Sequence, residues 1–206
     1  MSAFQKSNFL IALISPSGGG KTAILNEVLK HNSNISYSIS FTTRPPRFNE
    51  TNDVDYHFIS QAEFDEIKAE NGFLENARVH DFCYGTSRRF VEAELEKGHH
   101  ILMDIDVRGA LQIMEKNIDL VTIFILPPSQ NELLRRLKAR KTETESVLER
   151  RLKTAENEMR EIRHFDYLVI NDNLEQAVAE VEQIIAVEEN KVKRYKNIYE
   201  TYYGGK

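Results

Sequence analysis

Cysteine is almost absent from the chain, because Cys83 is the only one among 206 residues. A single cysteine cannot form an internal disulfide, so the chain is not a disulfide-stapled scaffold and a reducing compartment is expected. Long hydrophobic runs are missing as well. The apolar stretch from Phe9 to Ile14 is too short for a membrane span or for the core of a secretory signal.

An excess of positive charge is also absent, since 27 lysines and arginines face 32 aspartates and glutamates, for a formal charge of −5. This balance does not favour binding to nucleic acid or to an anionic membrane through bulk charge. Hydrophobic residues make up 41% and charged residues 29%, which excludes disorder and fibres. We expect a soluble cytoplasmic protein with no nucleic-acid or membrane partner; the sequence does not indicate its oligomeric state.

Short apolar runs alternate with helical segments along the chain, a pattern that favours an α/β layered fold. A helix is expected after the first apolar run, because Ile24, Leu25 and Val28 share one face. The expected buried strands are Leu10–Ile14, Ile101–Ile105, Leu120–Leu126 and Tyr167–Ile170.

Residues 37–96 have a different pattern of apolar and polar residues and are predicted to form an inserted lobe. Apolar and polar residues alternate from Ile35 to Phe41, as in a half-exposed strand, and a second short strand is expected near Tyr56–Ile59. Ser60 and Glu63 form a capping box that begins a helix, and Gly72 is placed to end it.

A second special region begins with the capping box of Ser129 and Glu132. Five arginines follow it, interrupted at 142–145 by residues with no apolar anchor, so a mobile flap is expected there. These arginines are Arg135, Arg136, Arg140, Arg150 and Arg151.

The last helix is predicted to start at Asp172 with Glu175 in its cap. Its buried face is predicted to consist of Leu174, Val178, Val181 and Ile185. We therefore expect residues 1–206 to form a single domain. Its expected parts are a core (1–36, 97–128 and 160–206), the lobe (37–96) and a lid (129–159).

The segment between the first strand and the first helix has the composition of a phosphate-binding loop. Its residues are Ser15, Pro16, Ser17, Gly18, Gly19, Gly20, Lys21 and Thr22. Inward N–H groups and the positive end of the helix would cradle an anion, Lys21 would reach terminal phosphates, and Thr22 could bind Mg²⁺. Serine stands where the pattern has its first glycine, which requires a backbone φ that is not positive. The alternative is a glycine-rich turn that happens to precede a lysine.

Five further segments follow in the order and spacing of the guanylate kinases, and the chain resembles that family from about Leu10 to about Ile185. They are Ser40–Arg47, Asp55–Tyr56, Phe73–Glu75, Tyr84–Thr86 and Asp104–Asp106. The resemblance implies a P-loop parallel-sheet core with helices on both faces, an inserted GMP-binding lobe and a mobile lid. It also implies Mg²⁺-assisted phosphoryl transfer from ATP to GMP, and to dGMP, in purine nucleotide metabolism.

The resemblance places two groups of residues around GMP. Those matching the binders of its phosphate are Arg44, Arg47, Tyr56 and Tyr84, whose guanidinium forks and phenols suit phosphate oxygens. Glu75 matches the reader of the guanine N1 and N2 edge, with Ser40 and Thr86 as partners for the guanine carbonyl. Read alone, the two arginines could equally be solvated turn residues, and Glu75 a surface glutamate.

Asp104 and Asp106 end a predicted buried strand, where ligands collect in open parallel sheets. The resemblance places both at the GMP site, Asp104 towards Mg²⁺ and the phosphates and Asp106 towards the guanine. The metal ligands would be Thr22 and Asp104, directly or through water, although which aspartate serves the metal stays open. Asp106 to Gly109 also spells the DxxG pattern of GTPase switches, but the chain contains no Asn-Lys-x-Asp motif.

Catalytic roles are implied for Lys21 and Arg44 and for the lid arginines Arg136, Arg140 and Arg151, which would close over the transferred group. A basic helix face paired with Glu132 and Glu149 is the alternative for the lid. Lys141 replaces the usual glycine of the family. Asn171 matches a residue near the ATP adenine, or is a turn residue before the Asp172 cap.

Two other classes of function remain for comparison. An interaction module of the same fold would keep the GMP lobe and lose the phosphate loop, which is intact here from Gly20 to Thr22. A GTP-hydrolysing switch would need the missing base-reading motif. Phosphoryl transfer from ATP to GMP therefore fits the sequence best.

Overall fold

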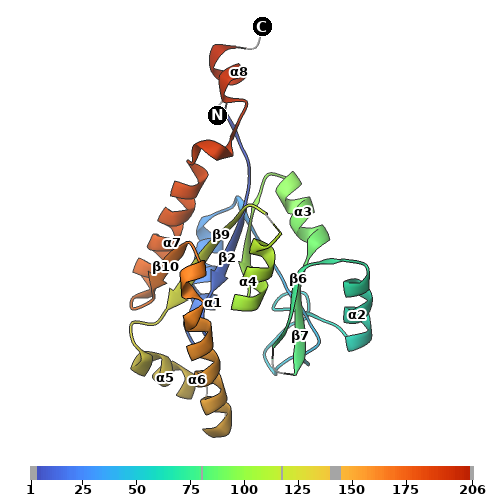
Figure 1. The fold of residues 1–206 in the computed structure, drawn as a ribbon, viewed down its shortest axis with the longest axis vertical. Coiled ribbons are helices and arrows are strands. Elements are labelled where there is room, and N and C mark those ends of the chain that lie inside the picture. Colours follow the sequence, from blue (N-terminus) through green and yellow to red (C-terminus); the bar gives the residue numbers. More distant parts are fainter. Residues whose placement is uncertain (1–3, 80, 117, 140–144, 205–206) are drawn as a thin grey trace.

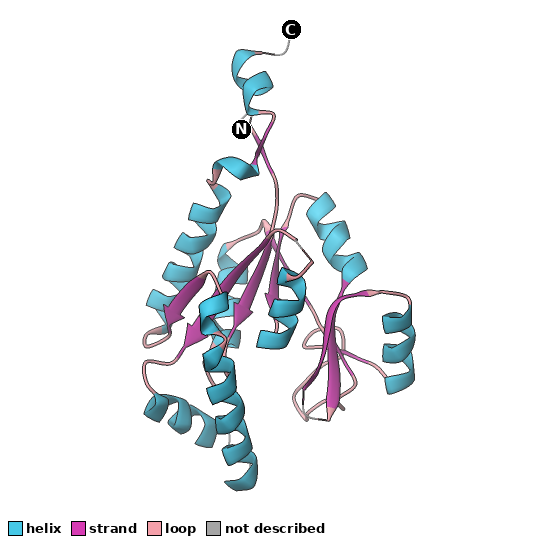
Figure 2. Cartoon of the chain, in the orientation of Figure 1, coloured by secondary structure: helices cyan, strands magenta, loops and turns pink. Residues whose placement is uncertain are grey.

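A parallel sheet forms the centre of the molecule (Figures 1 and 2). The computed structural model describes residues 4–79, 81–116, 118–139 and 145–204. Among these, five strands are hydrogen-bonded in the order β10-β9-β2-β8-β3, each parallel to its neighbours. They are β2 (Leu10–Ile14), β3 (Ile35–Ser38), β8 (His100–Asp104), β9 (Leu120–Leu126) and β10 (Tyr167–Ile170). The four predicted buried strands are present, and β8 is shifted by one residue.

Helices cover both faces of this sheet, which confirms the predicted α/β core. Side chains of successive residues in a strand point to opposite faces, so β2 supplies two cores. Ile11 and Leu13 pack with α1 (Lys21–His31) and α7 (Leu174–Glu189). Leu10, Ala12 and Ile14 pack on the other face, with α3 (Arg88–Glu96) and α4 (Val107–Met114).

A smaller sheet stands beside the core, on the right in Figure 2. Its strands run in the order β5-β4-β7-β6, and the predicted helix α2 (Gln61–Ala69) begins at the capping box of Ser60 and Glu63. The strands are β4 (Phe41–Thr42), β5 (His57–Phe58), β6 (Phe73–Val79) and β7 (Phe82–Ser87).

Two details of this region differ from the sequence prediction. The single half-exposed strand expected over Ile35–Phe41 is split: β3 pairs with β8 in the core sheet, whereas β4 pairs with β5 and β7. The left-handed residue that ends α2 is Asn71, at φ +55°, and not Gly72. The N–H of Gly72 closes the turn by donating to the carbonyl of Ile67 at 2.9 Å. A Cβ on residue 72 would lie 2.8 Å from Ile67 Cγ2, so glycine is required there for space.

Two helices, α5 (Gln130–Lys138) and α6 (Glu145–Arg160), make up the predicted lid region, and a 3₁₀ turn (Ile162–His164) follows. Leu133 and Leu137 of α5 pack against Ala155 of α6. The predicted capping box of Ser129 and Glu132 is only half formed. Ser129 accepts the N–H of Glu132, but the Glu132 carboxylate pairs with arginines instead. Of the expected flap at 142–145, Glu145 begins α6, and the other three residues, like Arg140 and Lys141, lie outside the described residues.

The predicted last helix differs at its start. The side chain that caps α7 is Asn173, which accepts the N–H of Gln176 at 3.0 Å, and not Asp172. Leu174 is 39% exposed, whereas Val178, Val181 and Ile185 are buried as expected. Nor is α7 the last helix. The chain continues through a 3₁₀ turn (Val192–Arg194), β11 (Tyr195–Lys196) and α8 (Ile198–Tyr203), and β11 pairs antiparallel with β1 (Gln5–Lys6).

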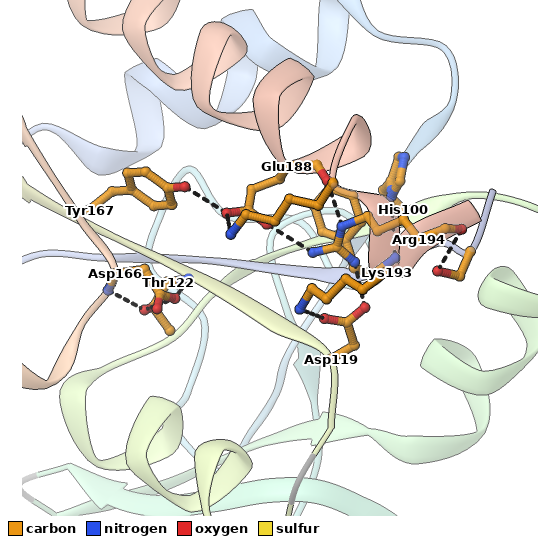
Figure 3. Close-up of polar contacts among 11 residues, drawn as sticks. His100, Asp119, Thr122, Asp166, Tyr167, Glu188, Lys193 and Arg194 are labelled. Carbon is orange, nitrogen blue, oxygen red and sulfur yellow. Dashed lines mark hydrogen bonds and ion pairs between the residues drawn. The ribbon is translucent and has the colours of Figure 1, made fainter. Parts of the chain in front are cut away.

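Arg194 ties this C-terminal segment to the edge of the sheet where the strands begin (Figure 3). It is 1% exposed; Nη2 donates to Glu188 Oε2 at 3.0 Å and Nη1 pairs with Asp119, at the start of β9. Its guanidinium also lies 3.7 Å from the centre of the Phe9 ring, a cation–π contact. Buried ionic groups need such complete partnering, because an unpaired charge is costly in the interior.

No helix in the described ranges is both long and apolar enough to cross a membrane.

Candidate functional site

The glycine-rich loop joins the end of β2 to the start of α1, as the sequence predicted. Gly18 and Gly20 have φ values of +92° and +91°, a conformation that residues with a side chain rarely adopt. No side chain caps the first turn of α1, so its N–H groups remain available to an anion. The loop therefore has the backbone geometry of a phosphate cradle.

The backbone and the contacts of Ser15 explain why the first position of the loop accepts a serine in place of glycine. Its φ is not positive, and its hydroxyl donates to the carbonyl of Pro16 at 2.8 Å. A Cβ on Gly19 would lie only 1.9 Å from Ser15 Oγ. The serine hydroxyl thus fills space inside the loop that only a glycine at position 19 leaves free.

Replacing Ser15 with glycine removes one local hydrogen bond without changing the conformation that the loop requires. We expect kcat and the KM for ATP to stay within about fivefold of wild type, because a neutral hydrogen bond contributes only about 1 kcal/mol. Steady-state kinetics with varied ATP measures this. A loss of tenfold or more would mean that the hydroxyl contacts the nucleotide.

Arg136 and Asn171 hold the loop from outside. Asn171 Nδ2 donates to the Gly19 carbonyl at 3.1 Å, and Arg136 Nη1 reaches the same oxygen at 3.3 Å. Arg136 also donates to the Asn171 carbonyl at 2.9 Å and to Glu132 at 2.7 Å. The pairing with Glu132 that the basic-face alternative predicted is therefore present, but the same guanidinium also binds the loop.

Lys21 and Asp104 meet where β8 ends. Lys21 Nζ forms an ion pair with Asp104 Oδ1 and donates to the carbonyl of Ile105 at 3.1 Å. Asp104 lines a cavity of about 790 Å³ together with Thr22 and Arg151, and Arg151 Nη1 donates to Ser17 Oγ at 3.2 Å. The cavity thus brings together the Thr22 hydroxyl from the start of α1, the Asp104 carboxylate from the end of β8 and Arg151 from α6, and Lys21 is paired with the same carboxylate.

Asp106 lies apart from Asp104 and caps α4, where its Oδ1 accepts the N–H of Gly109 at 2.7 Å. It lines a second cavity, of about 390 Å³, with Arg108 and Glu158. Sequence reasoning missed Glu158, whose Oε2 is buried with no hydrogen-bond partner among the described residues. Burial, together with the charge of Asp106, raises the pKa of the Glu158 carboxyl to about 7.

The predicted phosphate binders of the lobe do come together. Arg44 Nε donates to the Tyr84 hydroxyl at 3.3 Å, and its guanidinium lies 5.3 Å from the centre of the Tyr56 ring. Arg47 and Tyr56 line the larger cavity, which Asp104 and Arg151 also line. Glu50 also belongs to this cluster and was not predicted, because a glutamate in an irregular loop gives no periodic signal.

Glu75 is buried at the start of β6, so it is not a surface glutamate. It is 4% exposed, and the Thr86 hydroxyl donates to its Oε1 at 2.6 Å. Burial raises the pKa of this carboxyl to about 7, against the lowering effect of Thr86. A Cβ on Gly109 would lie 2.6 Å from Glu75 Oε2, so the glycine of the DxxG sequence makes room for this carboxylate. Ser40 is buried as well, between β3 and β4.

Comparison with known proteins gives consistent results. The profile of the family described as guanylate kinase matches residues 7–188. The chain is 43% identical over 195 residues to the guanylate kinase of Clostridioides difficile strain 630, covering 95% of each sequence. It is 40% identical over 200 residues to that of Mesorhizobium japonicum, covering 97% of this chain and 92% of the relative. The crystal structure of guanylate kinase from Anaplasma phagocytophilum superposes with a TM-score of 0.83 at 31% identity, covering 98% of this chain and 96% of that one.

Proposed function

Because this chain belongs to the guanylate kinase family and transfers a phosphoryl group from ATP to GMP, giving ADP and GDP, we propose the following division of work among its residues. The small sheet binds the acceptor, the glycine-rich loop binds the donor, and the cavity between them holds the reacting groups. The observation that carries this proposal is the buried Glu75 carboxylate, which accepts the Thr86 hydroxyl in the same lobe as the arginine–tyrosine cluster.

The acceptor is held at both ends. The Glu75 carboxylate accepts the adjacent N1–H and amino donors of guanine, while Ser40, Thr86 and Asp106 complete the base site. Adenine has no donor at the N1 position, so it would leave this buried carboxylate unpaired at a cost of about 1–3 kcal/mol. Arg44, Arg47, Tyr56 and Tyr84 bind the phosphate with charge and with neutral hydroxyl donors.

The donor is held by the loop from Ser15 to Thr22, whose N–H groups surround the phosphates, with Asn171 fixing the loop and lying towards the adenine. Lys21 leaves Asp104 and neutralises the charge of the transferred group. The attacking atom is a phosphate oxygen that is already anionic, so no side chain has to remove a proton. Catalysis then consists of alignment and charge neutralisation.

The residues present fit Mg²⁺, which prefers oxygen ligands and binds through few protein groups. The Thr22 hydroxyl and the Asp104 carboxylate line the same cavity and would hold the ion, directly or through water. An ion held there would supply positive charge that neutralises the phosphate oxygens. We propose dGMP as a second acceptor, because the groups assigned here bind the base and the phosphate, which dGMP shares with GMP.

The lid supplies arginines to the transferred group. We propose this role for Arg151, which already reaches Ser17 of the loop, and for Arg140, which lies outside the described residues. Arg136 belongs to the same set and positions the loop through Gly19 and Asn171. Closure of the lid would exclude water and so suppress hydrolysis of ATP.

Arg135 and Arg136 offer a matched pair for testing the loop contact, because both pair with Glu132 but only Arg136 reaches the loop. We expect Arg136→Gln to lower kcat/KM for ATP about tenfold or more, since Gly19 of the loop and Asn171, which supports it, each lose a hydrogen bond from a charged donor. Arg135→Gln should stay within about twofold, as an exposed ion pair contributes little. Equal losses in both variants would assign the effect to the helix and not to the loop.

One assay tests the function as a whole: ADP release coupled to NADH oxidation, with ATP and each nucleoside monophosphate in turn. We expect turnover with GMP and dGMP and very little with AMP, CMP or UMP. An interaction module would show no turnover with any acceptor. A GTP-hydrolysing switch would release phosphate from GTP without needing a monophosphate.

A further inference from the structure

Glu50 binds both of the arginines that are predicted to bind the acceptor phosphate, Arg44 and Arg47. Its carboxylate forms a bidentate ion pair with Arg44: Oε2 accepts from Nη1 and Oε1 accepts from Nη2, both at 2.9 Å. Oε2 also accepts the backbone N–H of Arg47 at 2.8 Å, and Oε1 lies 3.7 Å from the Arg47 guanidinium. The Glu50 side chain is only 12% exposed, and it lines the larger cavity.

The hydrogens of Arg44 are therefore almost all engaged. A guanidinium carries five N–H donors. Two go to Glu50, one to the carbonyl of Pro45 at 2.9 Å and one to the Tyr84 hydroxyl. One N–H, on Nη2, remains without a partner among the described contacts. The Arg44 guanidinium, which was expected to bind a phosphate in bidentate fashion, is thus already bound by the Glu50 carboxylate.

Glu50 also fixes the backbone around Arg47. The carboxylate accepts the Arg47 N–H, and the Glu50 N–H donates to the Arg47 carbonyl at 3.1 Å. This pair of bonds closes the loop on itself and directs Arg47, whose side chain is 61% exposed, into the cavity. Burial alone would raise the pKa of the Glu50 carboxyl, but Arg44 and Arg47 hold that pKa below its usual range.

We propose that Glu50 is a positioning residue for the acceptor phosphate: it fixes the Arg44 guanidinium and the Arg47 backbone. Arg44 then offers the phosphate one N–H and its charge, while the exposed Arg47 guanidinium supplies the bidentate fork. This rests on the proposed function of the cluster. The two guanidinium groups and one carboxylate give a net charge of +1 at a site that receives a phosphate. Preorganised donors of this kind bind more tightly because they lose little freedom on binding.

The test is calorimetric titration of the Glu50→Gln variant with GMP and, separately, with guanosine, which lacks the phosphate. We expect the Kd for GMP to rise about 10- to 100-fold, while the Kd for guanosine and the KM for ATP stay within about twofold. Glu92→Gln is the matched control, because Glu92 forms an exposed pair with Arg88 on α3. That variant should bind both ligands as wild type does.

A tighter complex of GMP with Glu50→Gln would overturn the proposal, because Glu50 would then compete with the phosphate for Arg44. An unchanged Kd would overturn it too. Glu50→Asp provides a second measurement should the glutamine variant not fold, since it keeps the charge but is one methylene shorter and cannot hold both arginines. It should weaken GMP and spare guanosine. Arg44→Ala and Arg47→Ala distinguish a failure of the proposed role of Glu50 from a failure of the proposed phosphate site. If neither variant weakens the binding of GMP relative to that of guanosine, the proposed phosphate site itself is wrong.

Discussion

Replacement of Lys21 by alanine is expected to lower kcat about 10³-fold, equivalent to about 4 kcal/mol of transition-state stabilisation. Lys21 lies at the start of α1, where its ammonium reaches both Asp104 and the carbonyl of Ile105. Without it, the transferred group loses the ammonium that neutralises its charge. Lys21 is the one charged side chain between Ser15 and Thr22, so the loss should exceed that of any other single side chain of the loop.

The acceptor site should be unaffected by this change, because Arg44, Arg47 and Glu75 belong to the lobe. The measurements are steady-state kcat and the equilibrium Kd for GMP in the absence of ATP. Lys30→Ala is the matched control: Lys30 is on the same helix, but it pairs only with Glu27 on the exposed side. A fall in GMP affinity as large as the fall in turnover would contradict the division into two sites.

The loop itself could be predicted from the sequence because all of its determinants are local. Two residues at positive φ, a lysine and a hydroxyl follow within eight positions of a buried strand, and no distant partner is needed. Four of the five strands of the core sheet could be predicted for the same reason, since each is a mainly apolar run, whereas β3 alternates apolar and polar residues and was not assigned to this sheet. The capping box of α2 likewise needs only Ser60 and Glu63.

What the sequence could not provide were contacts between distant segments. Asn171 fixes Gly19 from 152 positions away, and Arg194 reaches Asp119 across 75. The position of a single polar residue in the sequence does not indicate which distant residue it will bind. The same limit explains the error at the start of α7, where Asp172 and Asn173 are both good N-cap residues and only the backbone path selects Asn173.

The Glu75→Gln variant tests the choice of base. Glutamine keeps the size of the side chain, and Thr86 can still donate to its oxygen, so we expect the fold of the lobe to be retained. The new amide donor, however, faces the N1–H or the amino group of guanine. This mismatch should cost about 2–4 kcal/mol in kcat/KM for GMP, through one lost charge-assisted contact and one unpaired donor. The KM for ATP should not change.

Kinetics with GMP, IMP and AMP as acceptors measure this effect, and Glu66→Gln, on the exposed side of α2 in the same lobe, is the control. IMP lacks the amino group, so wild type should use it poorly and the variant should narrow the gap between IMP and GMP. A variant that phosphorylates GMP as wild type does would exclude Glu75 as the reader of the base.

The pH dependence of GMP binding gives a second, independent signature of the same carboxylate. Burial raises the pKa of Glu75 to about 7 in the free protein, and guanine needs the ionised form as acceptor. Protonation therefore competes with binding, so GMP affinity should fall as pH drops below 7, approaching tenfold per pH unit. Glu75→Gln cannot be protonated and should keep only the weaker dependence from the GMP phosphate itself, whose second pKa is about 6. If the two proteins show the same profile between pH 6 and 8, the carboxylate does not bind the base in its ionised form.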